Sequence, residues 1–122
     1  MCRSFQGFSC LMQISTRSRD YIIDTLALRS NIGAALARPF ADASILKVLH
    51  GANSDVMWLQ KDFGLFLVNM MDTGQAAVIL DLPRGLAGLL QHFCQVSVRA
   101  LVPVPRPFRC SSQHICVMSY KF

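Results

Sequence analysis

The sequence contains no glutamate, so any carboxylate site in this chain must be built from aspartate. Seven aspartates are present, at positions 20, 24, 42, 55, 62, 72 and 81. No run of about 18 or more apolar residues occurs, so a transmembrane helix is not expected. The five cysteines are odd in number and include no Cys-x-x-Cys pair. This pattern indicates neither a zinc site nor a disulfide framework.

Charged residues are also scarce, at 16% of the chain, while 52% of the residues are hydrophobic and the mean hydropathy is +0.38. The length of 122 residues suits one domain. A composition this apolar is typical of a hydrophobic core that is covered by further helices or strands.

Hydrophobic periodicity predicts a hairpin followed by a helix in the first third of the chain. Apolar and polar residues alternate over residues 8–14, which predicts a half-buried strand. A polar turn at residues 17–19 leads to apolar residues 21–23, so we expect an antiparallel hairpin. Helical spacing follows over residues 28–36, and Pro39 should stop or bend that helix.

A short apolar run then leads into the segment HGANSDVMWLQKDFG, which holds the candidate site. Residues 45–49 predict a buried strand that ends at His50 and Gly51, where the backbone can turn. Asn53 or Ser54 is a suitable N-cap for the helix that we expect next.

Asp55 would share a face of that helix with Trp58 and Leu59. Removing an ionised carboxylate from water is costly unless a cation or hydrogen-bond donors compensate, so Asp55 is a candidate metal ligand. The alternative is that Asp55 lies in the first turn because the helix dipole favours negative charge there. The spacing by itself leaves both interpretations open.

Beyond this helix, residues 65–71 predict a further buried strand, and Asp72 and Thr73 are suitable caps for the helix after it. We predict that Asp72 caps this helix and is not a metal ligand. For Asp24 we likewise predict a structural role.

Three stretches of the chain resemble the 3′-to-5′ exonuclease domain of the ribonuclease D family, in particular its branch of exosome-associated exoribonucleases. They are RSFQGFSCLMQIST, DYIIDTLALRS and ILKVLHGANSDVMWLQKDFGLFLVNMMDT. The resemblance implies an α/β, ribonuclease H-like (DnaQ-like) fold with a mixed sheet and flanking helices. We expect residues 1–94 to be a partial exonuclease domain in which the first strand is missing. Without that central strand, part of the sheet should expose an unpaired edge.

The same resemblance implies two Mg²⁺ ions held by four acidic residues. Asp55 lies five residues after His50 and matches the second motif of the family. No counterpart is found for the Asp-x-Glu of the first motif or the Tyr-x-x-x-Asp of the third. Two-metal cleavage needs both cations to be held together, so we expect Asp55 to be the one retained catalytic and metal-binding residue and the chain alone to be inactive.

Residues 95–122 differ in character from the rest of the chain. They carry four basic residues and no acid, and three of the five prolines fall in the cluster PVPRP. This composition predicts a divergent, basic and disordered tail. The tail can alternatively bind RNA phosphates through its basic groups, or offer PVPRP as a polyproline ligand.

Three classes of function follow from these observations. The first is a fragment of an exoribonuclease, for which the resemblance implies RNA 3′ ends and the nuclear exosome as partners and a nuclear location. The second is a non-catalytic module that binds RNA or exosome partners. The third is a truncated product with no independent role. No membrane partner is expected, and no DNA-specific motif is present.

Overall fold

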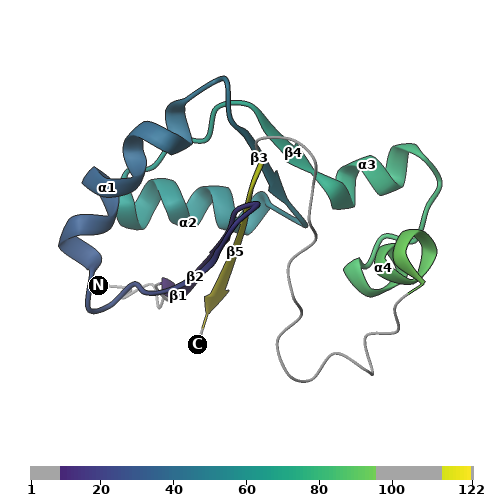
Figure 1. Cartoon of the computed structure of the whole chain (residues 1–122), viewed down its shortest axis with the longest axis horizontal. Helices are drawn as coiled ribbons and strands as arrows, with labels where there is room; N and C mark the ends of the chain where they lie inside the picture. The colour runs from purple at the N-terminus through teal and green to yellow at the C-terminus, as the bar shows by residue number, and fades with distance from the viewer. Residues whose placement is uncertain (1–8, 96–113, 122) are drawn as a thin grey trace, which may run out of the picture.

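The computed structural model describes residues 9–95 and 114–121. Its elements follow in the order β1 (Ser9–Ser15), β2 (Asp20–Asp24), α1 (Arg29–Ala41), β3 (Leu46–Leu49), α2 (Asn53–Phe63), β4 (Met70–Asp72), α3 (Thr73–Ile79), α4 (Leu86–Cys94) and β5 (His114–Lys121). The strands form one mixed sheet with the spatial order β2-β1-β5-β3-β4 (Figure 1). The α/β class that the sequence predicts is confirmed.

The predicted hairpin is formed by β1 and β2, which pair in antiparallel fashion with Met12 opposite Ile23 and Ile14 opposite Tyr21. Met12 and Ile14 are buried, as the period of two predicts. Strand β2 is the edge strand and is mostly exposed. Asp24 accepts hydrogen bonds from the N–H groups of Leu26 and Ala27, both at 3.0 Å, so its structural role is confirmed.

Strand β5 lies in the middle of the sheet, antiparallel to β1 on one side and parallel to β3 on the other (Figure 1). The structure therefore differs from the prediction of a disordered tail over residues 114–121. The expected gap in the centre of the sheet is also not left open, because β1 and β3 are both paired with β5 and neither has an unpaired edge. Backbone N–H and C=O groups make these bonds, so strand pairing needs no alternating side-chain pattern. Residues 96–113 lie outside the described part of the chain.

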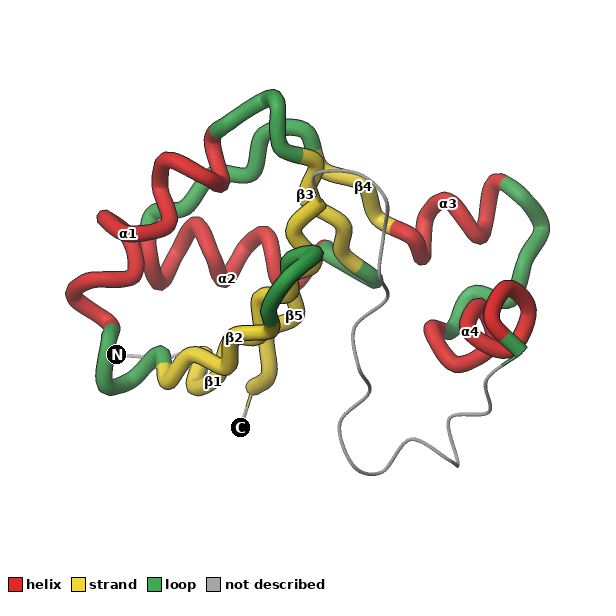
Figure 2. The backbone as a smooth tube through the Cα atoms, viewed as in Figure 1, coloured by secondary structure: helices red, strands yellow, loops and turns green. Residues whose placement is uncertain are grey.

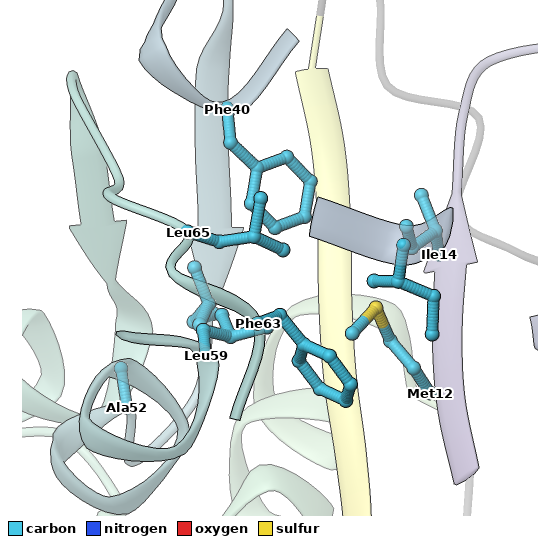
Figure 3. Packing of buried hydrophobic residues seen from close by; sticks show 9 residues of the cluster. Met12, Ile14, Phe40, Ala52, Leu59, Phe63 and Leu65 are labelled. Carbon is cyan, nitrogen blue, oxygen red and sulfur yellow. The ribbon is translucent and has the colours of Figure 1, made fainter. Parts of the chain in front are cut away.

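Helices α1 and α2 lie side by side against the sheet, whereas α3 and α4 extend away from the end of β4 (Figure 2). The two packed helices and strands β1 and β3 enclose one hydrophobic core. Its buried members are Met12, Ile14, Ile32, Phe40, Leu49, Ala52, Leu59, Phe63 and Leu65. Figure 3 shows Phe63 of α2 and Met12 of β1 pointing toward one another across this core. Helix α4 was not expected from the sequence pattern and has no buried residue.

The close contact between α1 and α2 depends on a residue without a side chain. A Cβ atom on Gly33 would lie 2.6 Å from the carbonyl oxygen of Phe63, a distance that real Cβ contacts do not reach. The preceding residue of α2, Asp62, accepts hydrogen bonds from the Ser9 N–H at 3.0 Å and from Arg29 at 3.4 Å. These contacts fix α2 to both β1 and α1. Helix α1 does not stop at Pro39 but continues to Ala41.

Lys47 is a fully buried cation within β3. Its ammonium donates hydrogen bonds to three backbone carbonyls, those of Asp42, Ile45 at 2.8 Å and Val68 at 2.7 Å. Burial lowers the pKa of Lys47, although attraction to Asp42 partly opposes this effect. The lysine thus joins the start of β3 to the segment that leads into β4.

The predicted strand over residues 65–71 is wrong in extent, because β4 contains only residues 70–72. The Leu65 N–H bonds to the carbonyl of Leu59 at the end of α2, and the Val68 N–H bonds to the carbonyl of Phe40. The N–H groups of Leu65 and Val68 are therefore bound near the ends of helices and are not available for strand pairing before β4 begins. Its apolar run was consistent with a strand in sequence, yet Phe66 is 64% exposed.

We expect Val117→Pro to lower the free energy of unfolding by about 1 kcal/mol or more, since proline removes a backbone N–H group from a strand in the middle of the sheet. Urea unfolding followed by circular dichroism measures the effect. Val117→Thr keeps the N–H group and β branching and is the matched control. Equal midpoints for the two variants would contradict the central place of β5, and a wild-type chain without cooperative unfolding would favour a product with no independent role.

Candidate functional site

The turn from β3 into α2 places the candidate carboxylate at the edge of the sheet. Gly51 has a φ of 67°, in the left-handed region that side chains disfavour, and this lets the chain reverse directly after His50. The N-cap position of α2 is Ala52, with no side-chain cap. The predicted N-caps Asn53 and Ser54 are therefore wrong, because both residues already lie inside the helix.

Asp72 supplies the hydrogen bonds that a local cap does not. Its two carboxylate oxygens accept the N–H groups of Gly51 at 2.9 Å and Ala52 at 2.8 Å. It also accepts the N–H groups of Gly74 at 2.8 Å and Gln75 at 3.4 Å, which confirms the predicted cap of α3. One carboxylate therefore holds the entry to α2 and the start of α3 together.

The pairing of β3 with β4 explains why this contact forms. Leu49 and Asp72 are partners in the parallel ladder, so the residue after Leu49 begins its turn beside the Asp72 side chain. The cap of α3 is predictable from the sequence because its donors lie two and three residues after Asp72. The bonds to Gly51 and Ala52 cross 21 and 20 positions in sequence, and no local pattern signals them.

Burial acts to raise the pKa of Asp72, but the N–H groups of Ala52, Gly51, Gly74 and Gln75 act in the opposite direction and bring the pKa below its ordinary value. Asp72 is therefore ionised at neutral pH, and both of its oxygens are engaged by backbone donors. This bonding matches a structural role for Asp72.

A second link joins the same turn to α3. The Thr73 hydroxyl lies 2.9 Å from Nδ1 of His50 and donates to the carbonyl of Leu49 at 3.0 Å. The His50 side chain is half-buried. Asp72 and Thr73 thus hold the backbone and the imidazole of this turn from two adjacent positions.

Asp55 lies in the first turn of α2 and is half-buried. Leu59, one turn further on, is 1% exposed, so the side of α2 on which Asp55 lies leads into the core. Trp58 is half-buried, and the Lys61 ammonium lies 4.8 Å from the centre of its ring. Placement on the inward-leaning face of α2 agrees with the sequence-based expectation.

Clusters of metal-binding side chains are not found in the part of the chain whose side chains are described. Over residues 9–95, no group of three or more His, Cys, Asp or Glu side chains is arranged to hold a metal ion. Strand β5 runs parallel to β3 and so reaches the same edge of the sheet, but its sequence HICVMSYK contains no acid. Asp55 fits the oxygen chemistry that Mg²⁺ prefers, as one ligand of a larger set.

No helix in the described part of the chain is long and apolar enough to span a bilayer.

Comparison with known proteins places these features in a family context. The sequence profile of a family described as 3′-5′ exonuclease matches residues 1–101. Human exosome complex component 10 is 58% identical over 95 residues, which are 77% of this chain and 11% of that protein. Protein RRP6-like 2 of Arabidopsis thaliana is 56% identical over 96 residues, covering 78% and 11%.

A solved structure gives the same result at the level of the fold. The catalytic core of RRP6 from Trypanosoma brucei superimposes with a TM-score of 0.73 and 45% sequence identity, covering 90% of this chain and 33% of that one. The chain spans about a tenth of the length of the curated relatives that it matches.

The lowered pKa of Asp72 predicts a specific dependence of stability on pH. Below pH 3.8 the unfolded chain binds a proton that the folded carboxylate still lacks, so the free energy of unfolding falls as the pH falls through this window. In Asp72→Asn this contribution is absent. Its urea midpoints should therefore fall less steeply than those of the wild type between about pH 4 and the folded-state pKa.

At neutral pH, Asp72→Asn should also be less stable by about 1–3 kcal/mol, because an amide nitrogen then faces backbone N–H donors. Asp20→Asn, at an exposed position of β2, is the matched control and should be close to wild type. Parallel pH curves for wild type and Asp72→Asn would contradict the assigned hydrogen bonds.

Proposed function

The chain belongs to the 3′-5′ exonuclease family, and from that membership we propose that its residues 1–94 are a portion of an RNA-trimming exonuclease domain. Residues 95–122 form a divergent segment that supplies β5 to the sheet. The single observation that carries the proposal is the fixed turn from β3 into α2, where His50 precedes Asp55 by five residues at the edge of a ribonuclease H-like sheet.

In this proposal Asp55 is a metal ligand. The family generally depends on divalent metal ions, and Mg²⁺ is the ion that we propose for this site. Three features of Asp55 support the role: it is half-buried, it follows directly on the end of β3, and the turn before it is held by Asp72. The first helical turn also satisfies the helix dipole, so the two roles of Asp55 are compatible.

We propose further that these 122 residues alone do not catalyse RNA cleavage. The chain contains no glutamate, and β5 brings no carboxylate to the edge where α2 begins. Mg²⁺ is usually held by one or two carboxylates together with substrate phosphates, and a two-metal centre needs more. An active centre at Asp55 would need carboxylates from residues other than these.

The partners in this proposal are the 3′ ends of single-stranded RNA and the nuclear exosome, with a nuclear location. Two of the relatives are exosome components or exonucleases by name, human exosome complex component 10 and the exosome complex exonuclease RRP6 of Saccharomyces cerevisiae. The net charge of +5 agrees with a polyanionic ligand. Binding without cleavage is the alternative function, as a module for RNA or exosome partners.

Titration with Mn²⁺ tests the metal-binding role of Asp55. We expect the paramagnetic ion to broaden the amide NMR signals of the first turn of α2 in the wild type, because carboxylate oxygens are suitable Mn²⁺ ligands. Asp55→Asn should lose this broadening, whereas Asp20→Asn should keep it. Broadening that survives in Asp55→Asn would contradict the assignment.

Incubation with end-labelled single-stranded RNA and Mg²⁺ tests the catalytic proposal. The purified chain should leave the RNA at full length, since a single carboxylate does not hold two cations. Metal-dependent shortening that Asp55→Asn abolishes would overturn the claim of inactivity and leave the metal-ligand role intact. Salt-dependent binding without shortening would favour the non-catalytic module.

A further inference from the structure

The hydrogen bonds of Thr73 determine which nitrogen of His50 carries a proton. A hydroxyl group has one hydrogen, and that of Thr73 is donated to the carbonyl oxygen of Leu49, which can only accept. The contact of 2.9 Å between the Thr73 hydroxyl and Nδ1 of His50 must therefore run in the other direction. Nδ1 is the donor, and the neutral imidazole is the Nδ1–H tautomer.

This tautomer leaves a lone pair on Nε2. Within the described part of the chain, the one hydrogen bond of the His50 side chain is the bond from Nδ1. The ring also lies close to the start of α3, where a Cβ atom on Gly74 would be 3.6 Å from its Cε1 atom. The imidazole is thus held by α3, with an acceptor nitrogen that no described residue uses.

The anchoring of the turn makes this acceptor a fixed feature. Asp72 holds the N–H groups of the two residues that follow His50, and Thr73 holds the ring itself. Preorganised acceptors bind a donor without the cost of ordering a mobile side chain.

We propose that His50 is a ligand-binding residue of the Asp55 site, and that its Nε2 accepts a hydrogen bond from a ribose hydroxyl of a bound nucleotide. The inference rests on the proposed function, because it takes the nucleotide to lie beside Asp55. Thr73 is then a positioning residue that acts through the imidazole. A ribose hydroxyl is the donor that separates an RNA end from a chain end without hydroxyls.

Long-range proton–nitrogen NMR spectra test the tautomer in the full chain at a pH of about 8.5, some two units above the ordinary imidazole pKa. His50 should show a protonated Nδ1 and an unprotonated Nε2. His92 is exposed on α4 and is the internal reference in the same spectrum. Thr73→Val should release the Nδ1–H preference, and Thr73→Ser, which keeps the hydroxyl, should restore it.

Adenosine 5′-monophosphate and its 2′,3′-dideoxy analogue then test the acceptor. Only the nucleotide with ribose hydroxyls should shift the His50 Nε2 signal, and the shift should be lost in Thr73→Val. A free chain with the proton on Nε2, or equal shifts with both nucleotides, would overturn the inference. The Mn²⁺ titration at Asp55 is independent of this result, so a failed proposal of function is distinguished from a failed assignment of His50.

Discussion

The carboxylate of Asp72 is the contact on which the arrangement of the site depends. It accepts backbone N–H groups from the turn before α2 and from the first turn of α3, so it connects two chain segments at the edge of the sheet. The turn before α2 has no side-chain cap of its own. Without this carboxylate, the direction in which α2 leaves β3, and with it the place of Asp55, would rest on packing alone.

Strand β5 illustrates that completing the sheet and binding a metal ion place different requirements on the sequence. It pairs with both β1 and β3 and so joins the β1–β2 hairpin to the β3–β4 pair. Backbone hydrogen bonds accept nearly any extended segment, whereas metal binding depends on particular side chains at particular places. A strand whose sequence contains no acid can therefore complete the sheet without adding a carboxylate to it.

The interactions that place the other buried polar groups are of the same kind. Lys47 lies inside the protein because three carbonyls accept its protons, and Asp62 lies between β1 and α1 because it accepts from both. Each charge is compensated by hydrogen bonds, as the cost of burying an isolated charge requires. The partners of Asp62 and the Val68 carbonyl bound by Lys47 are distant in sequence, whereas the other two carbonyls bound by Lys47 are local. Asp55 is half-buried, which agrees with a role that needs a partly desolvated carboxylate.

Local pattern in the sequence determined the β1–β2 hairpin, the strand before His50, the cap of α3 and the helix that carries Asp55, because each depends on neighbours a few residues apart. Only the tertiary structure decided the short extent of β4, the placement of β5 and the contacts of Asp72 with Gly51 and Ala52. Those features depend on backbone groups that meet through strand pairing, and side-chain periodicity carries no information about which distant backbone groups will meet.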